Sequence, residues 1–474
     1  MAGALIAGID SSTSATKVEV RDVDSGLVVA RGAAPHPQTQ PPRSEQDPET
    51  WWTAFETAWA QAGAPAVAAL AVAGQQHGMV VLDDAQRVVR PAKLWNDTES
   101  AVDAEQLIDL LPGGAGGWAA ACGTVPVASL TITKLRWLRR SEPRAWDALA
   151  HVVLPHDWLT FRLTGRLATD RGDASGTGYW SPASNSYRHD LLGLVDPDRD
   201  WGTAVPEVLD PYGRAGIWNG AVVAAGTGDN MAGAMGIGLR SGDVAVSLGT
   251  SGTVYSVSEH PTADATGAVA GFADATGRFL PLVCTLNATK VTETVRRLFG
   301  VDHATLDELV LGEPAGARGL TLLPYFDGER TPNRPQSSGV LVGLRTDLDR
   351  AQLARAAFEG VVCGLLDGLD ALAAVAGTDG DLVVVGGGAR SAAYQQVLAD
   401  LAGRPVIVPD AVEQVAAGAC VQAAAALTGA EAADIADRWQ LHAGHVVEPG
   451  PGTHAAADVR AAYAGLRDAA VTKP

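Results

Sequence analysis

The sequence is poor in cysteine and has no long apolar segment. Its four cysteines are scattered over 474 residues and form no CxxC pair. That pattern predicts neither a metal site nor a disulfide framework, and it is typical of a reducing compartment. No apolar run reaches membrane-spanning length, and no basic segment followed by an apolar one opens the chain. We therefore expect a cytoplasmic protein without a membrane partner.

Positive charge is also scarce. The chain has 35 Lys and Arg against 54 Asp and Glu, which gives a formal net charge of −19 at pH 7. Because polyanions are repelled by such a chain at long range, we expect no nucleic-acid partner. Any phosphate site must work locally, through backbone amides and a few cations.

Two stretches far apart in the sequence share one pattern. DSSTSATK (10–17) and SLGTSGTV (247–254) each follow an apolar run and precede a second strand-like segment. Each is typical of a β-hairpin with a turn of small hydroxyl residues, and such a turn can bind phosphate. Either copy alone is more typical of ordinary turn chemistry. The repeat favours two related halves that bind one polyphosphate from opposite sides.

The length predicts two or three domains. Strands alternating with helices predict an α/β fold, and the hairpin opening each half makes each sheet mixed. We place the boundary between residues 236 and 242, which gives an N-terminal lobe (1–238) and a C-terminal lobe (239–474). We also expect glycines at 112–117 to interrupt a helical region, a loop-rich stretch at 169–185, and a last helix at 455–469 that could pack on either lobe.

Three acidic or amide residues stand at the ends of predicted strands. Asp229 lies between a strand end and a helix start, where a carboxylate could accept a proton from an attacking alcohol; the alternative is a helix N-cap. Asn230 could bind a polyol or equally cap the helix. Asp10 could hold Mg²⁺, or it could be an Asx-turn residue. Lys17 could neutralise phosphate charge or be a solvated strand residue.

Two further loops follow predicted strands. GQQHG (74–78) places Gln76 and His77 where α/β sheets usually contact ligands, although a lone loop histidine is more often structural. GGGAR (386–390) is a glycine turn between a strand and a helix, where backbone could lie against a nucleotide base or ribose. Such a turn is weak evidence alone.

Taken together, these motifs resemble the FGGY family of carbohydrate kinases. The resemblance rests on the Asp10 loop, GTGDN (226–230), SLGTSGT (247–253) and GGGAR. Further stretches extend it over nearly the whole chain: SEQDPETWW (44–52), GQQHG, RPAKLWND (90–97), LPHDWLTFRLTG (154–165), DASGTGYW (173–180) and LPYFDGERTPN (323–333). Within the family the chain is most similar to members that phosphorylate xylulose.

The resemblance implies two actin-like, ribonuclease-H-like lobes, each a mixed sheet flanked by helices, with an active-site cleft between them. It implies ATP-dependent phosphorylation of D-xylulose at the C5 hydroxyl, with Asp229 as base and Gln76, His77 and Asn230 contacting the sugar. Asp10 would help to place Mg²⁺. The nucleotide would be bound by Ser12, Thr13, Ser14, Lys17, Gly249, Thr250 and Ser251 at its phosphates and by Gly387 and Gly388 near the adenosine. The oligomeric state stays open, with a homodimer as one expectation.

Two departures from the family pattern bear on these expectations. Ser12 replaces a glycine of the first loop, so a hydroxyl contact could replace backbone approach to phosphate. Gln76 stands where xylulose-phosphorylating members often carry methionine, which could change how the sugar is bound. The alternatives are a kinase of the same family for ribulose, another ketose or a polyol, and a non-catalytic nucleotide switch of the actin or Hsp70 type.

Overall fold

The computed structural model describes residues 3–450 and 455–469. Two compact units make up the chain. The first contains Met1–Leu239, Ser258–Leu280 and Ala411–His442, and the second contains Arg240–Val257, Pro281–Asp410 and Ala443–Pro474. The first unit thus takes in two segments from the C-terminal half of the sequence. The lobe limits at residue 238 and the cleft between the lobes stay predictions.

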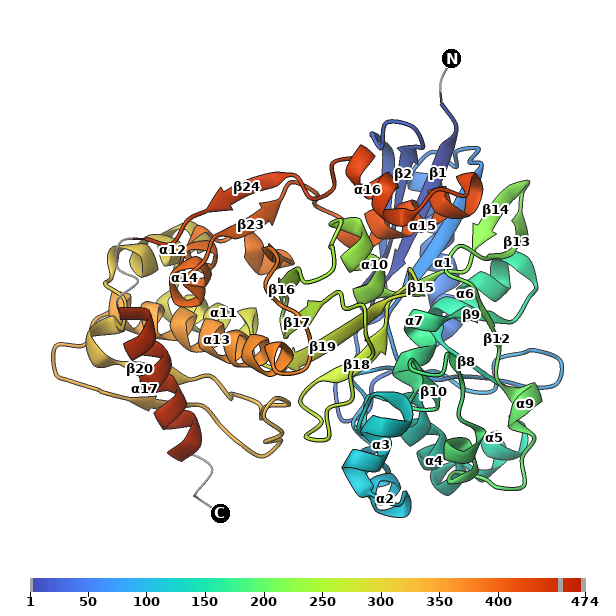
Figure 1. The fold of residues 1–474 in the computed structure, drawn as a ribbon, viewed down its shortest axis with the longest axis horizontal. Helices are drawn as coiled ribbons and strands as arrows, with labels where there is room; N and C mark the ends of the chain where they lie inside the picture. Colours follow the sequence, from blue (N-terminus) through green and yellow to red (C-terminus); the bar gives the residue numbers. More distant parts are fainter. Residues whose placement is uncertain (1–2, 451–454, 470–474) are drawn as a thin grey trace. The chain divides into compact units, whose positions relative to one another are not determined.

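The first unit is built on a mixed sheet in the order β13-β14-β5-β1-β2-β3 (Figure 1). The predicted hairpin at residues 10–17 forms: β1 and β2 are antiparallel and pair Asp10 with Lys17. Strands β5 and β14 continue the sheet in parallel, and β15 pairs with the end of β5. The strands are β1 (Leu5–Ser11), β2 (Ala15–Asp22), β3 (Val28–Pro35), β5 (Ala69–Gly74), β13 (Arg214–Trp218), β14 (Ala221–Ala224) and β15 (Thr227–Gly228).

Helices cover both faces of this sheet. On one face, α1 (Pro48–Gln61) and α6 (Pro155–Thr164) close an apolar core. The start of α1 has the pattern typical of a helix N-terminus, because Asp47 accepts the N–H of Glu49 at 3.0 Å and a proline follows at the first helical position.

On the other face, α10 (Asp229–Gly236) packs against α15 (Gln414–Thr428) (Figure 1). A Cβ atom added at Gly236 would lie 1.8 Å from the carbonyl oxygen of Gln414, and one at Gly418 would lie 1.7 Å from that of Ala232. The two backbones therefore touch, which the small residues at these positions allow. This contact fixes the helix that begins at Asp229.

A second apolar core in the first unit lies among α2 to α5 and β8. The expectation that glycines at 112–117 interrupt the helical region was wrong in part, because residues from Gly114 onward form α3 after a left-handed turn at Gly113. The prediction of a loop-rich stretch at 169–185 was also wrong: residues 169–182 are buried and contain short helices and strands. These elements are α2 (Ala101–Leu110), α3 (Gly114–Cys122), α4 (Thr131–Ser141), α5 (Pro143–Asp147), β8 (His151–Val153), β9 (Ala168–Asp170), α7 (Arg171–Ala174), η1 (Ser175–Thr177) and β10 (Trp180–Ser181).

The remaining short elements of the first unit lie around these two cores. Several pair two by two, as β4 with β7, β6 with β8, β9 with β12 and β10 with β11. They are β4 (Glu45–Gln46), β6 (Val80–Leu82), β7 (Ala92–Lys93), β11 (Ser186–Tyr187), α8 (His189–Gly193), α9 (Trp201–Ala204), β12 (Glu207–Leu209), β18 (Ala270–Ala273) and α16 (Ala432–Arg438).

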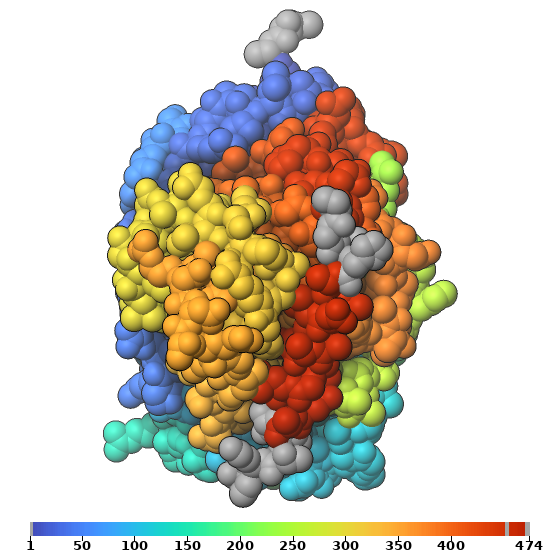
Figure 2. Space-filling view, turned by 90° about the vertical axis from the view of Figure 1, so that its left-hand side faces the viewer, coloured from blue at the N-terminus to red at the C-terminus, as the bar shows by residue number. Residues whose placement is uncertain are grey.

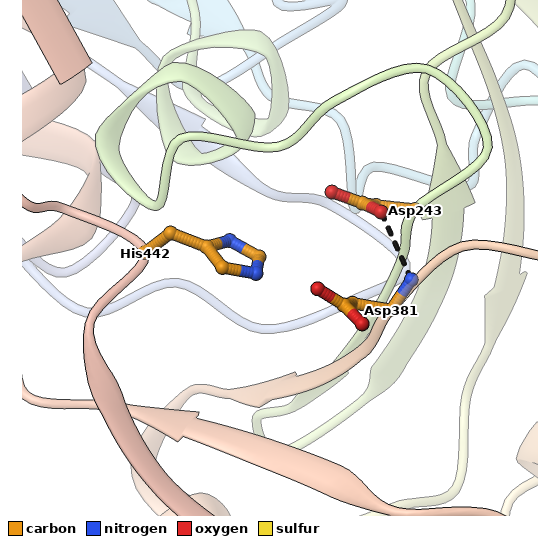
Figure 3. Close-up of side chains that lie close together, drawn as sticks. All are labelled: Asp243, Asp381 and His442. Carbon is orange, nitrogen blue, oxygen red and sulfur yellow. Dashed lines mark hydrogen bonds between the residues drawn. The ribbon is translucent and has the colours of Figure 1, made fainter. Parts of the chain in front are cut away.

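The second unit is built on strands in the order β19-β17-β16-β22-β23-β24. The predicted hairpin forms from β16 and β17, and β22 and β23 follow in parallel. One carboxylate oxygen of Asp243 accepts the N–H of Asp381 at 2.9 Å, which ties the starts of β16 and β22 together (Figure 3). The strands are β16 (Val244–Leu248), β17 (Gly252–Ser256), β19 (Phe279–Thr285), β22 (Leu382–Val385), β23 (Val406–Pro409) and β24 (Gly444–Val447).

The last helix, α17 (Ala456–Ala469), packs on the second unit. It lies on the surface of that unit (Figure 2) and contacts β20, α13 and α14, and its own Tyr463 side chain is buried. This contact answers the question that the sequence left open. The other elements of the unit are α11 (Thr289–Phe299), α12 (His303–Gly312), η2 (Ala317–Gly319), β20 (Thr321–Leu323), β21 (Val340–Val342), α13 (Arg350–Ala373), η3 (Gly387–Arg390) and α14 (Ala392–Ala402).

Within residues 3–450 and 455–469, no single helix is long and apolar enough to cross a membrane. By length and composition alone, α15 and α16 taken together could cross one, but they are bent by 117° at the break between them.

Candidate active site

Three strands of the first unit end side by side and carry candidate residues. In β1, Asp10 lies opposite Ala73 of β5, and in β15, Thr227 lies opposite the same residue from the other side. Parallel strands present the residues beyond their carboxyl ends at one edge of a sheet, where α/β folds bind ligands. Asp10 and Asp229 therefore stand at the same edge, on either side of β5.

The turn that carries Asp229 is shaped by glycine. Gly226 has φ +78°, and a Cβ atom there would lie 2.6 Å from the carbonyl oxygen of Val72. Helix α10 then begins at Asp229 with Gly228 as its N-cap, so the N-cap interpretation of Asp229 was wrong. Its carboxylate accepts the N–H of Asn230 at 2.9 Å. A negative charge at this first helical residue is favoured by the helix dipole.

Gln76, Asp229 and Asn230 come together as one group. The Asn230 side-chain amide donates to Gln76 Oε1 at 2.7 Å and to Asp229 Oδ1 at 3.0 Å. A Cβ atom added at Gly228 would lie 2.6 Å from Gln76 Cγ, so that glycine admits the glutamine. His77 has φ +64° and its ring lies 5.3 Å from that of Phe272. The loop thus turns Gln76 toward the asparagine and buries the histidine ring.

Burial raises the pKa of Asp229 to about 7, and the neighbouring charges of Asp10 and Asp173 add to that rise. Burial likewise raises the pKa of Asp10 to about 6, although a hydrogen bond from Ser12 opposes the rise. Asp229 is only half-buried by its exposed surface, so its carboxylate meets both solvent and like charges. A carboxyl group that titrates near neutrality is suited to accept a proton from an alcohol.

The first phosphate-loop candidates are already engaged with neighbours. The Ser12 hydroxyl donates to Asp10 Oδ1, and Thr13 Oγ1 accepts from Trp95 Nε1 at 2.8 Å. The carbonyl oxygen of Ser14 accepts the N–H of His36 at 2.8 Å. Lys17 Nζ lies 2.6 Å from Glu413 Oε2, with 39% of the lysine side chain exposed. The loop is therefore braced by residues that the sequence reasoning did not assign, Trp95 within LWND being one of them.

In the second unit, the turn of the β16–β17 hairpin rests on the start of α11. The carbonyl oxygen of Gly249 accepts the Thr289 hydroxyl at 2.7 Å, and that of Thr250 accepts the N–H of Ala288 at 3.3 Å. The glycine turn after β22 packs on the same hairpin, because Cβ atoms at Gly386 and Gly388 would lie 2.8 Å and 2.7 Å from atoms of Leu248.

Gly387 behaves differently from its two neighbours, since a Cβ atom there would meet nothing within 4 Å. The end of β16 thus packs against η3, which contains Gly387 and Gly388. That Gly249, Thr250 and Ser251 bind phosphates and that Gly387 and Gly388 lie near the adenosine stay predictions.

A buried polar cluster beneath the first unit's site was missed by the sequence reasoning. His156 Nδ1 lies 2.7 Å from Asp173 Oδ2, and Asp157 and Asp170 lie nearby. The available signal was a histidine and three aspartates within two short segments, PHDWL and TDRGDASG.

Comparison with known proteins gives matches over nearly the whole chain. The N-terminal domain model of the FGGY family of carbohydrate kinases matches residues 5–236, and the C-terminal domain model matches residues 244–427. A xylulose kinase from Streptomyces coelicolor is 49% identical over 458 residues, which cover 94% of this chain and 93% of that protein.

A xylulose kinase from Escherichia coli is 35% identical, with 84% of each chain covered. The crystal structure of xylulose kinase from Bifidobacterium adolescentis is similar at a TM-score of 0.86 and 39% identity, covering 98% of this chain and 99% of that one.

Proposed function

Because the chain belongs to the FGGY family of carbohydrate kinases, we propose that it transfers the γ-phosphate of ATP to the C5 hydroxyl of D-xylulose. The products are D-xylulose 5-phosphate and ADP. The substrate is supported by relatives named xylulose kinase that align with nearly the whole chain. The observation that carries the chemistry is Asp229, a carboxylate with a pKa of about 7 beside two amide side chains.

In this proposal Asp229 is the general base. Phosphoryl transfer to an alcohol needs a group that accepts the hydroxyl proton as the oxygen attacks. At pH 7 to 8, a carboxyl group with a pKa of about 7 is ionised in a large share of molecules. The hydrogen bonds from Asn230 hold one of its oxygens, so the orientation of the carboxylate is fixed before the sugar arrives.

Gln76, His77 and Asn230 bind the sugar in this proposal. Gln76 Oε1 is occupied by Asn230, whereas Gln76 Nε2 is buried and has no hydrogen-bond partner among the described residues. A buried amide donor without a partner is costly, and a sugar hydroxyl would satisfy it. In this proposal the side-chain amide of Gln76 donates a hydrogen bond to the sugar, which methionine, frequent at this position in similar proteins, cannot do.

The donor set near Asp10 fits Mg²⁺. Asp10 is a buried carboxylate, and its charge contributes to the raised pKa of Asp229, so the two acidic groups repel each other there. Hard oxygen ligands of this kind suit Mg²⁺, which keeps water and phosphate oxygens as its other ligands. We infer that Asp10 holds the ion, which when bound with ATP would neutralise phosphate charge.

ATP itself is assigned to two sets of residues, each within its own unit. In the first unit, the phosphates would be contacted by Thr13, Ser14 and Lys17. Ser12 would contribute less, because its hydroxyl is hydrogen-bonded to Asp10. Gly249, Thr250 and Ser251 would do so from the second. Gly387, which leaves open space above it, and Gly388 would lie against the adenosine.

The test is ADP release with a panel of ketopentoses, ketohexoses and polyols. We expect the highest kcat/KM for D-xylulose, with little ADP formed when no sugar is present. A higher kcat/KM for ribulose or a polyol would replace the substrate and keep the reaction. ADP release that no sugar stimulates would refute the proposed function and favour a nucleotide switch.

A further inference from the structure

A single imidazole lies among three carboxylates in the interior of the first unit. His156 Nδ1 is 2.7 Å from Asp173 Oδ2, and Nε2 is 3.2 Å from Asp157 Oδ1 and 3.9 Å from Asp170 Oδ1. All four side chains are at most 1% exposed. Buried charges are costly unless they are paired, so a group of this composition is held together by the charge of its one cation.

His156 carries that charge. Burial alone would lower the pKa of its imidazole, but Asp157, Asp173 and Asp170 raise the pKa to about 9. Arg171 interacts electrostatically with Asp170, but among the described residues the hydrogen bonds of the three carboxylates come from backbone N–H groups, Thr227 and His156.

Two of the carboxylates reach the loops of the candidate active site. The backbone N–H of His77, which lies in the proposed sugar-binding loop, is near enough to Asp173 to lower the pKa of its carboxyl group. Asp170 Oδ2 accepts the hydroxyl of Thr227 at 2.8 Å, two residues before Asp229. The N–H of Asp173 in turn donates to Asp170 at 2.9 Å. Each loop is thus connected to the imidazole through one carboxylate.

The imidazole also fills the space beneath both loops. A Cβ atom added at Gly74, where the first loop begins, would lie 2.8 Å from Cβ of His156. A Cβ atom added at Gly226, where the second begins, would lie 2.7 Å from Cδ2 of the same ring. Only glycine at both positions lets the two loops close over one side chain.

We propose that His156 is a positioning residue that holds the Gln76–His77 loop and the Asp229 turn in register through Asp173 and Asp170. It does not touch substrate, because it is fully buried beneath the two turns. The inference rests on the proposed function, since the loops matter only if they bind the sugar and carry the base. Misplacement of reacting groups by a fraction of an ångström lowers rates strongly, so a remote positioning group has a measurable effect on turnover.

The test compares His156→Gln with the wild type, after the wild type has been shown to phosphorylate D-xylulose. Glutamine keeps a polar side chain but has no positive charge. We expect kcat to fall and KM for the sugar to rise, each by about 10-fold, with KM for ATP little changed. In the ligand-free protein, amide hydrogen exchange should become faster at residues 74–78 and 226–230. That second readout does not depend on the substrate, so failure of the proposed function and failure of this inference are distinguishable.

Two further variants separate positioning from general stability. Arg21→Gln breaks a buried ion pair with Glu19 (2.7 Å) on β2, and it should lower the melting temperature without changing kcat or KM for the sugar. His156→Gln combined with Asp173→Asn should be no worse than the more damaging single change, because the two residues act through one contact.

Thr227→Val keeps the test decisive if the His156 variant does not fold. Valine has nearly the shape of threonine but cannot donate to Asp170, so kcat should fall several-fold while the protein stays folded. Wild-type kcat in this variant would overturn the proposal. So would a folded His156→Gln protein with wild-type kcat, KM and hydrogen exchange, or one whose losses match those of Arg21→Gln.

Discussion

Replacing Asp229 by asparagine removes a charge and a proton acceptor while the size of the side chain hardly changes. Both hydrogen bonds that Asp229 Oδ1 accepts, from the N–H and the side-chain amide of Asn230, can be kept by an amide oxygen. The arrangement of Asn230 and Gln76 should therefore survive, and KM for the sugar should change by less than about 5-fold. A general base contributes on the order of 10²–10⁴ in rate, and kcat should fall by that factor.

The same substitution should stabilise the folded protein. The pKa of Asp229 is raised from 3.8 to about 7, so the folded state loses stability as pH rises through that interval, and above pH 7 the unfavourable contribution is fully present. A shift of that size corresponds to about 4 kcal/mol at full weight. Because the carboxylate is only half-buried, solvent screens part of it, and we expect a gain of roughly 1–2 kcal/mol at pH 8.

Three measurements on one preparation decide the matter: kcat from ADP release, sugar affinity from calorimetry, and the melting temperature at pH 8. We expect a large loss of kcat, nearly unchanged affinity and a higher melting temperature than that of the wild type. A kcat close to the wild-type value would refute the role of Asp229 as base. A lower melting temperature would refute the electrostatic reasoning, because it would mean that the ionised carboxylate is favourable where it lies.

Three further outcomes follow from other parts of the molecule. Between pH 6 and pH 9 the melting temperature of the ligand-free protein should fall. The pKa values of His156 (about 9) and Asp157 (about 7) are raised above their ordinary 6.5 and 3.8, so the folded state binds protons that it loses over this range. A melting temperature that rises with pH would contradict this reasoning. Gln76→Ala should raise KM for the sugar about 10-fold without changing KM for ATP, and steady-state kinetics with each substrate varied in turn will check it. Gly387→Ala and Gly388→Ala should both raise KM for ATP, because both glycines are assigned to the adenosine, but only Gly388→Ala should also lower the melting temperature, because only its added methyl meets protein atoms; equal melting temperatures would remove the steric argument.

The sequence predicts those parts of the fold that local patterns determine. The hairpins at 10–17 and 247–254 follow from alternating strands around short turns, and both form. The start of α1 follows from Asp47 and the proline after it. By contrast, the helix through Gly114 was not predicted, because glycine weakens a helix locally and only tertiary packing of Trp118 in an apolar core makes up for it.

For the candidate site, too, some residues can be predicted from local sequence patterns and others cannot. Asp229 and Gln76 became candidates because each stands within two residues of the end of a strand, and the end of a strand can be predicted from the sequence. The role of His156 could not be read from its surroundings in the sequence, where it is a polar residue at the start of a helix. Its partners come from segments that meet only in the fold, and an imidazole becomes a buried cation only once three carboxylates surround it. The residues that we propose for the chemistry are therefore visible in the sequence, whereas those that we propose to hold them in place depend on contacts that only the folded chain creates.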